Sequence, residues 1–262
     1  MTLLRAAHPG PALAVTVLAA LLAASFDLGP GTGVLVVAAV LTGQLSIGWS
    51  NDLVDLARDR AVGRTDKPLV DGSVSPTAAR AACAVVVVAT VPLSLACGWL
   101  AGAVHLVCVA AGWVYNLGAK ATPLSWLPYA VAFGGLPVYV SLTADPDTAP
   151  AWWLPAAGAL LGVGAHVVNV LPDLDDDAAT GVRGLPHRLG RRWSPMAAAV
   201  VLVAAALVIV LGAPVDSGAV ATLALLVTAG LAAVALLAHG RAPFRAAVAM
   251  ALVDVAMLVW AR

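Results

Sequence analysis

Three polar side chains at four-residue spacing, Asn51, Asp55 and Asp59, suggest chemistry by their types and positions. If this segment is helical, residues four and eight positions apart lie on one face over about two turns. Carboxylates at that spacing repel each other, so the face requires a cation close by. Oxygen ligands without nearby His or Cys suit Mg²⁺, which usually bridges carboxylates to substrate phosphates. The triplet therefore predicts a magnesium site for a phosphorylated substrate.

The triplet recurs 118 residues later as Asn169, Asp173 and Asp177. Two glycines and one proline that follow the first triplet recur at the same offset: Gly63 as Gly181, Pro68 as Pro186, and Gly72 as Gly190. Six matches at one offset predict an internal duplication of a helix followed by a polar loop. The second copy therefore supplies a second set of possible Mg²⁺ ligands.

Basic residues surround both acidic triplets, and they are Arg58, Arg60, Arg64, Lys67, Lys120, Arg183 and Arg188. Acids that hold a metal, together with bases that hold anionic oxygens, are what a diphosphate requires. The alternative is a pair of solvated polar loops whose charges pair with one another. The repeat favours the diphosphate interpretation.

The composition indicates that lipid surrounds most of the chain. Apolar residues make up 61% of the sequence, charged residues only 11%, and the mean hydropathy is +0.96. Soluble domains are about half apolar and a quarter charged, so this chain has too few charges for a water-facing surface. The formal net charge is zero and predicts no nucleic-acid partner. The three cysteines lie in apolar runs without metal or disulfide spacing and are expected to pack.

Nine apolar runs have about the length that crosses a bilayer. They are 11–28, 33–53, 77–95, 98–117, 125–143, 151–171, 195–213, 218–238 and 243–261. We therefore predict an all-α membrane protein, a bundle of nine transmembrane helices built from the internal repeat. Residues 1–262 are expected to form a single membrane domain.

The basic residues predict the orientation of these spans. With the N-terminus in the cytoplasm, thirteen of the fourteen Lys and Arg residues fall in cytoplasmic segments, and only Arg262 falls outside. This distribution follows the positive-inside rule. Both acidic loops follow even-numbered spans and so share one membrane face. We expect an integral protein of the inner or plasma membrane whose active site faces the cytoplasm.

Several segments resemble the UbiA-type intramembrane prenyltransferases. The run from Asn51 to Gly63, followed by Lys67-Pro68-Leu69, closely resembles the first aspartate-rich motif of that family. The second triplet, with Gly181 and the tail at 185–190, resembles the second motif. The segment from Tyr115 to Lys120 resembles a Tyr-Ser-x-x-x-Lys segment of the family, and Arg5-x-x-x-Pro9 resembles its opening segment.

Two positions depart from the family pattern. Val170 stands where the first copy has Asp52, and Asn116 replaces the usual Ser. The resemblance nevertheless extends over essentially the whole chain.

The resemblance implies that the chain transfers an isoprenyl group from an isoprenyl diphosphate to a lipophilic or aromatic acceptor in the bilayer, with Mg²⁺ as cofactor. It implies a lateral opening to lipid and a polar cap over the acids. The catalytic acids would be Asp55, Asp59, Asp173 and Asp177, which would bind Mg²⁺ together with Asn51 and Asn169. The diphosphate would contact Lys67, Lys120, Arg188 and, as a weaker candidate, Arg64.

Three further polar residues at membrane depth are cavity candidates. His166 lies seven residues before Asp173, so it could contact an acceptor, take a proton or serve a structural role. Asp254 lies deep in the last span and is either functional or paired with a polar neighbour such as His105. Tyr115 is expected to line the cavity. Pro172 should kink the helix that carries the second triplet.

The sequence leaves three functions open. The leading one is prenyl transfer between two molecules. The second is an intramembrane terpene cyclase, in which the prenyl chain captures its own cation. The third, from another class, is a transporter or metal-binding protein that uses the duplicated acids as an ion path.

Overall fold

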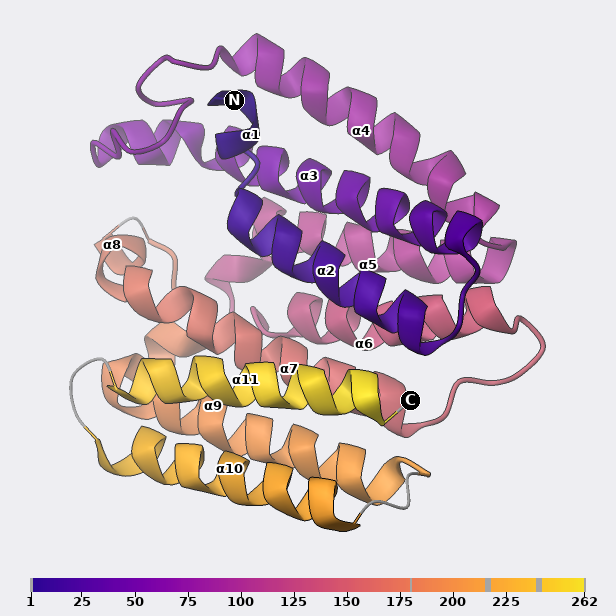
Figure 1. Ribbon diagram of the computed structural model, residues 1–262. Coiled ribbons are helices and arrows are strands. Elements are labelled where there is room, and N and C mark those ends of the chain that lie inside the picture. The colour runs from indigo at the N-terminus through magenta and orange to yellow at the C-terminus, as the bar shows by residue number, and fades with distance from the viewer. Residues whose placement is uncertain (1, 180, 215–217, 239–241, 262) are drawn as a thin grey trace. The chain divides into compact units, whose positions relative to one another are not determined.

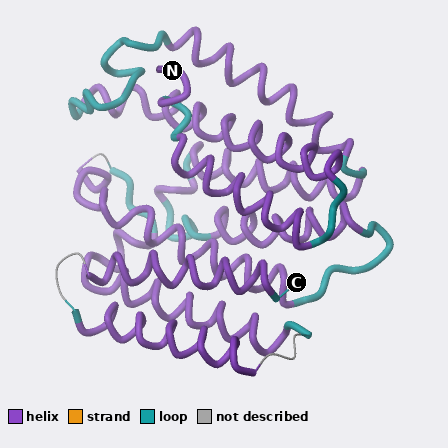
Figure 2. The backbone as a smooth tube through the Cα atoms, viewed as in Figure 1, coloured by secondary structure: helices purple, strands orange, loops and turns teal. Residues whose placement is uncertain are grey.

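The computed structural model describes residues 2–179, 181–214, 218–238 and 242–261, with the backbone alone described at residues 175, 176 and 179. Every regular element in these ranges is a helix, which confirms the all-α prediction for them (Figures 1 and 2). The elements are α1 (Thr2–Arg5), α2 (Pro9–Ser25), α3 (Pro30–Ala61), α4 (Pro76–Ala96), α5 (Trp99–Leu117), η1 (Ala119–Ala121), α6 (Leu127–Ala144), α7 (Trp153–Val170), η2 (Leu171–Asp173), α8 (Leu174–Ala179), α9 (Leu185–Gly212), α10 (Gly218–Leu237) and α11 (Ala242–Trp260).

The nine predicted runs correspond in order to α2–α7 and α9–α11. In the described part of the chain, eight helices are long and apolar enough to cross a membrane, and α2 is a shorter apolar helix of 17 residues. Large apolar side chains are exposed along these helices, including Val88 at 71% and Leu211 at 79%. Such exposure suits contact with lipid rather than water. An integral membrane protein is therefore supported, whereas the count of nine spans and the orientation stay predictions.

The described chain forms two compact units, the first made of Met1–Gly118 and Tyr139–Thr148. In this unit α3 packs against α2, α4 and α5. The N-terminal segment lies directly on α3, since Gly48 is so close to the backbone of Ala7 that a side chain there would collide with it. Small residues allow this close approach of two backbones within a membrane protein.

Helix α3 continues two turns beyond the predicted apolar run and ends at Ala61. The segment 52–61 contains Leu, Ala and Arg but neither Gly nor Pro, so it favours helix. Arg58 and Arg60 in the last turn suit the negative end of the helix dipole. The helix then stops at Gly63, which has a positive φ of 72°.

The second unit consists of Ala119–Val138 and Ala149–Arg262. Within it α7 packs against α9 and α11, and α9, α10 and α11 pack against one another. The part of α6 in this unit approaches α7 closely through glycines. Gly158 lies against the backbone of Phe133, and Gly162 against that of Tyr129. These contacts fix the position of Tyr129 relative to α7.

Pro172 interrupts the helical segment that carries the second triplet, as predicted. The α-helical hydrogen bonding of α7 ends at Val170, a 3₁₀ turn covers Leu171–Asp173, and α8 begins at Leu174. Proline lacks the N–H that would continue the α-helix. The two copies of the repeat therefore differ in local structure, because the first triplet lies on one uninterrupted helix.

Candidate active site

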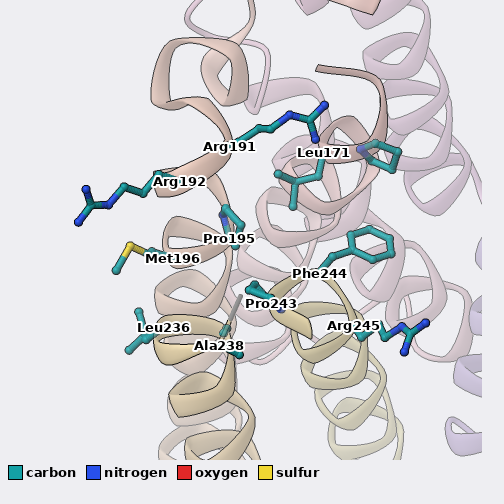
Figure 3. Close-up of a pocket in the computed structure, with 12 residues that line it drawn as sticks. Leu171, Arg191, Arg192, Pro195, Met196, Leu236, Ala238, Pro243, Phe244 and Arg245 are labelled. Atoms are coloured by element: carbon teal, nitrogen blue, oxygen red, sulfur yellow. The ribbon is translucent and has the colours of Figure 1, made fainter. Parts of the chain in front are cut away.

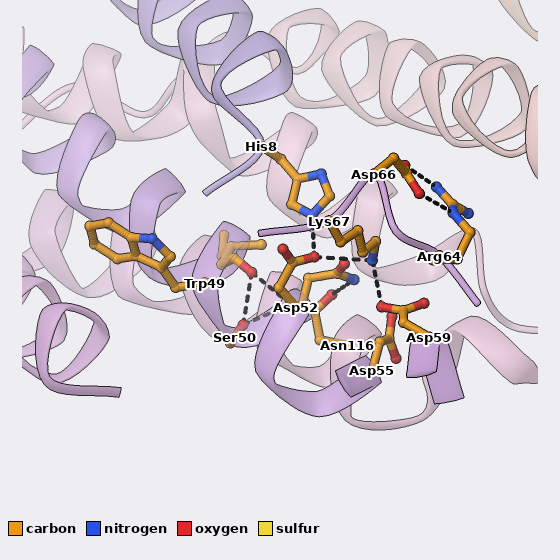
Figure 4. A network of polar contacts seen from close by, with 12 residues as sticks. His8, Trp49, Ser50, Asp52, Asp55, Asp59, Arg64, Asp66, Lys67 and Asn116 are labelled. Atoms are coloured by element: carbon orange, nitrogen blue, oxygen red, sulfur yellow. Dashed lines mark hydrogen bonds and ion pairs between the residues drawn. The ribbon is translucent and has the colours of Figure 1, made fainter. Parts of the chain in front are cut away.

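The first acidic triplet lies on one face near the end of α3, and Figure 4 shows two of its members, Asp55 and Asp59. Asp55 and Asp59 are buried, and Asn51 is half-buried. A guanidinium nitrogen of Arg58 lies 2.8 Å from Oδ2 of Asp55. The predicted helical face is confirmed, and cations from the same unit lie against its carboxylates.

Lys67, from the loop after α3, lies between two of these carboxylates (Figure 4). Its Nζ donates to Oδ2 of Asp59 at 2.8 Å and lies 3.0 Å from Oδ1 of Asp52. Burial alone would lower the pKa of Lys67, but the hydrogen bond to Asp59 and the charge of Asp52 outweigh burial and raise it above its ordinary value. The ammonium group is therefore charged at neutral pH and neutralises two carboxylates at once.

Asp52 connects this cluster to the N-terminal segment. Oδ1 of Asp52 lies 2.8 Å from Nε2 of His8, and the indole N–H of Trp49 donates to the carbonyl oxygen of Leu3 at 2.9 Å. Asp52 thus holds both His8 and Lys67. Its counterpart in the second copy, Val170, has no polar group with which to do the same.

Asn116 holds the side chain of Asn51. Nδ2 of Asn51 donates to Oδ1 of Asn116 at 3.1 Å. Asn116 is itself held because its Nδ2 donates to the carbonyl oxygen of Ile47 at 2.9 Å and to the hydroxyl of Ser50 at 2.7 Å. The asparagine that departs from the family pattern is therefore part of the polar network around the first triplet.

The second triplet is more open than the first. Asn169 and Asp173 are exposed, and Asp177 is half-buried. Nδ2 of Asn169 donates to the hydroxyl of Tyr129 at 3.3 Å, and Nε2 of His187 lies 3.5 Å from Oδ2 of Asp177. The three residues come from α7, η2 and α8, so the second copy lacks the single uninterrupted helix of the first. Pro172 is the physical reason for this difference.

His166 is completely buried beside the second triplet. Its Nε2 lies 2.9 Å from the hydroxyl of Ser125, which also accepts a hydrogen bond from the backbone N–H of Leu185 at 2.8 Å. The ring of Tyr129 lies 4.9 Å from the imidazole, measured between centroids. His166 therefore joins α7 to the segment before α6, which supports a structural role, while its contact with Tyr129 keeps it next to Asn169.

The predicted diphosphate ligands differ in their surroundings. The guanidinium of Arg64 makes two hydrogen bonds to Asp66, at 2.9 and 3.1 Å. Lys120 is buried on η1, and Arg188 is exposed with its Nε donating to the carbonyl oxygen of Arg183 at 3.2 Å. Arg64 would have to leave Asp66 to bind a phosphate, which agrees with its lower rank among the candidates.

Asp254 is completely buried in α11. Neither of its carboxylate oxygens has a hydrogen-bond partner among the described residues, so the predicted pairing with a polar neighbour is not formed there. His105, the neighbour named in the prediction, instead has its Nδ1 2.7 Å from the hydroxyl of Ser94. Tyr115 is half-buried on α5, and its role as a cavity residue stays a prediction.

Comparison with known proteins identifies the family. Residues 12–260 match the UbiA prenyltransferase family. The chain belongs to the UbiA family. This membership favours the enzymatic hypotheses over the transporter.

Two curated relatives illustrate the likeness. The chain is 29% identical over 196 residues to the bacteriochlorophyll synthase 33 kDa chain of Cereibacter sphaeroides, covering 69% of this chain and 62% of that protein. It is 32% identical over 165 residues to the digeranylgeranylglyceryl phosphate synthase of Methanothrix thermoacetophila, covering 60% of this chain and 58% of the relative. The chain thus spans less than two thirds of each of these relatives.

A solved structure supports the UbiA fold. A UbiA homologue from Archaeoglobus fulgidus bound to GPP and Mg²⁺ superposes with a TM-score of 0.74 and 16% sequence identity. The match covers 100% of this chain and 99% of that one. At this identity the likeness concerns the fold alone.

The donor atoms of the first triplet suit the Mg²⁺ that the UbiA resemblance implies. Asn51, Asp55 and Asp59 offer hard oxygen ligands, which Mg²⁺ prefers. Among the described residues, no three His, Cys, Asp or Glu side chains gather closely enough to hold a metal by themselves. Lys67 instead contacts the carboxylate of Asp59. The residues fit Mg²⁺ provided that Lys67 gives up this contact.

Several residues of the polar networks were not singled out by the sequence as site residues. They are His8, Ser125, Tyr129 and His187. Each lies outside the repeated positions, and His187 occupies a variable position within the tail of the second motif, so periodicity and repeat comparison carry no signal for these residues. Asn116 is different, because its departure from the family pattern already marked it.

Proposed function

We propose that this UbiA-family chain is a Mg²⁺-dependent prenyltransferase that moves an isoprenyl group from an isoprenyl diphosphate to a lipophilic or aromatic acceptor. The reaction would take place in a bundle of nine spans, on the side of the bilayer facing the cytoplasm. The acids of both copies, Asp55, Asp59, Asp173 and Asp177, would bind the metal together with Asn51 and Asn169.

One observation carries the proposal. Lys67 lies between Asp52 and Asp59, with Asp55 and Asn51 on the same face of α3. A cation and several hard oxygen ligands therefore lie together near the end of α3, a helix that is otherwise largely apolar. Such a mixture suits a molecule whose head is a diphosphate and whose tail is hydrocarbon.

The reaction begins with the loss of diphosphate. Mg²⁺, when bound, neutralises negative charge on the phosphate oxygens. Lys67, Lys120 and Arg188 would hold the same oxygens, and their charges stabilise the anion as the allylic C–O bond breaks. Both electrons of that bond leave with the diphosphate, and an allylic carbocation remains on the prenyl chain.

The apolar interior protects the cation until the acceptor captures it. Exclusion of water prevents its hydrolysis to a prenyl alcohol. An aromatic carbon or a hydroxyl oxygen of the acceptor donates an electron pair to form the new bond, and the acceptor then loses a proton. His166 and Asp254 are candidates to contact the acceptor, although the hydrogen bonds of His166 also suit a structural role.

The test uses the purified full chain in lipid nanodiscs. The protein is given geranyl, farnesyl or geranylgeranyl diphosphate with a panel of acceptors, and products are identified by mass spectrometry. Prenylated acceptor should form with Mg²⁺ and should fall to background with EDTA. Asp55→Asn and Asp173→Asn should each lower the rate by at least 10²-fold, since each removes a charged metal ligand.

Asp147→Asn is the matched control, because Asp147 is an exposed aspartate outside both triplets. It should leave the rate unchanged. Terpene hydrocarbon or alcohol formed without any acceptor would identify a cyclase instead. Full activity of both Asp55→Asn and Asp173→Asn would contradict the assigned site.

A further inference from the structure

Asp52 lies beside the first triplet without belonging to it. It is 2% exposed, and its Oδ1 lies 3.0 Å from Nζ of Lys67. Asp52 and Asp59 are seven residues apart on α3, so they lie almost in line on the helix surface, about two turns apart. Lys67 bridges them, as Figure 4 shows. Its ammonium group therefore contacts one proposed Mg²⁺ ligand, Asp59, and one acid outside that set.

The N-terminal segment fixes Asp52 from outside the helix. Nε2 of His8 lies 2.8 Å from Oδ1 of Asp52. The same segment is held on α3 by the indole N–H of Trp49, which donates to the carbonyl oxygen of Leu3 at 2.9 Å. Asp52 is thus a carboxylate in a fixed position, whereas Lys67 is a long, flexible side chain on the loop after α3.

The internal repeat shows that the two partners occur together. The positions 118 residues after Asp52 and Lys67 are Val170 and Leu185. The second copy therefore lacks both the acid and the lysine, although it keeps the triplet itself. An acid that served the metal directly would be expected in either copy, with or without a lysine. The joint absence connects the function of Asp52 to Lys67.

The surroundings of Val170 explain why an acid there would serve no purpose. Val170 forms a buried cluster with Leu171 and Leu174, and Phe244 packs against it. Leu171 and Phe244 also line a recess of the second unit (Figure 3). A carboxylate at position 170 would be buried among hydrocarbon side chains, which is unfavourable unless a cation lies beside it.

We propose that Asp52 positions Lys67 for the diphosphate, an inference that rests on the proposed function. When Asp59 binds the metal, Lys67 gives up this partner and keeps Asp52, which is buried and would otherwise lose its ion pair. The ammonium group then remains beside the triplet, and it has more donors than one carboxylate oxygen uses, so it can also hold a phosphate oxygen. Asp52 is therefore a positioning residue that acts through Lys67.

A double-mutant cycle tests whether Asp52 acts through Lys67. Wild type, Asp52→Asn, Lys67→Met and the double variant are placed in lipid nanodiscs. Calorimetry measures their binding of geranyl thiolodiphosphate, in which sulfur replaces the oxygen of the bond that breaks, with Mg²⁺ and with EDTA. Asp52→Asn and Lys67→Met should each weaken Mg²⁺-dependent binding by about tenfold. The double variant should also be about tenfold weaker rather than about 100-fold, because both changes remove the same contact.

Arg58→Met provides the matched comparison. Arg58 lies on the same helix and pairs with Asp55 at 2.8 Å. Asp52→Asn should therefore weaken binding by about tenfold in the Arg58→Met background, as it does in the wild type, and should have no further effect only in the Lys67→Met background. A general defect of the site would lower binding in both backgrounds, which would contradict a role through Lys67.

The outcomes separate this proposal from the proposed function. Wild-type affinity in Asp52→Asn would overturn the role of Asp52, as would a further tenfold loss when Asp52→Asn is added to Lys67→Met. If Asp52→Asn alone does not fold, the double variant, which removes both charges, is compared with Lys67→Met, and equal binding supports the proposal. Wild-type binding that is the same with Mg²⁺ and with EDTA would refute the proposed function, and the role of Asp52 with it.

Discussion

Nδ2 of Asn51 donates to Oδ1 of Asn116 at 3.1 Å, and this hydrogen bond orients the amide group that we propose as a Mg²⁺ ligand. The second copy shows the same relationship with a different partner, since Nδ2 of Asn169 donates to the hydroxyl of Tyr129 at 3.3 Å. Residues that orient a metal ligand in this way typically change metal affinity or activity by about 10- to 100-fold when they are removed.

We therefore predict that Tyr129→Phe raises the Mg²⁺ concentration for half-maximal activity by about tenfold. The variant keeps the aromatic ring and loses only the hydroxyl that accepts from Asn169. A Mg²⁺ titration of initial rates at saturating prenyl diphosphate measures the effect. Tyr139→Phe is the matched control, because its buried hydroxyl contacts Cys97 in the other unit and no proposed ligand. Equal Mg²⁺ curves for Tyr129→Phe and the wild type would refute the positioning role.

A separate prediction concerns the first copy. Asn116→Ala should raise the Mg²⁺ requirement about tenfold, because Asn51 loses its acceptor. Asn116→Ser, which introduces the residue usual in the family, keeps a hydroxyl that can accept and should remain closer to the wild type. Initial rates over a range of Mg²⁺ concentrations distinguish the two variants. If Asn116→Ser and Asn116→Ala have the same Mg²⁺ requirement, the proposal that Asn116 orients Asn51 is wrong.

Lys67→Met should change both the stability of the metal-free protein and its activity. Removing the ammonium leaves Asp52 and Asp59 without their shared cation, so the metal-free protein loses stability and Mg²⁺ should raise its Tm more than that of the wild type. At the same time the diphosphate loses a ligand, and kcat/KM should fall by about 10²-fold. Thermal unfolding with and without Mg²⁺, followed by steady-state kinetics, measures both. A smaller Mg²⁺-induced rise in Tm than in the wild type would contradict the competition between Lys67 and the metal.

The spacing of apolar and polar residues predicted much of the fold, because helix formation depends on interactions between residues that are close in the sequence. The length of an apolar run predicts a span, and the four-residue spacing of Asn51, Asp55 and Asp59 predicted a shared face on what is one continuous helix. Pro172 predicted the break in the second copy for the same reason, since a missing N–H acts within one turn.

The contacts between distant segments could not be predicted in this way. His8 and Asp52 are 44 residues apart, and Ser125 and His166 are 41 apart. In each pair one residue lies outside the helices, and the sequence spacing carries no trace of how such a segment packs against a distant helix. Of the two alternatives that the sequence left open for Asp254, the pairing with a polar neighbour is not formed among the described residues. Sequence spacing could not decide this, because the direction a buried side chain faces depends on how its helix packs.

The contact between His8 and Asp52 predicts a role for the N-terminal segment. His8→Leu removes a hydrogen bond to a buried carboxylate and should lower the free energy of unfolding by about 1–2 kcal/mol. Limited proteolysis should then cut the segment before α2 more rapidly. His8→Gln keeps a side-chain donor and should restore most of the resistance. Equal cleavage rates for His8→Leu and the wild type would show that Trp49 and Gly48 hold the segment without His8.

For Asp254 we predict that removing the polar group raises stability rather than lowering it. A buried polar group without a hydrogen-bond partner destabilises a fold by about 1–3 kcal/mol, so an apolar residue of similar size should be better tolerated there than the carboxyl group. We predict that Asp254→Val raises Tm, while Asp254→Asn, which keeps a polar group of the same shape, changes it little. Unfolding followed by intrinsic fluorescence in one detergent compares the three proteins. A fall in Tm for Asp254→Val would mean that the carboxyl group has a favourable partner after all. A rise in Tm together with loss of prenyl transfer would instead show that the membrane bundle keeps an unfavourable carboxyl group because the reaction needs it, which is the usual reason for an ionisable residue at this depth.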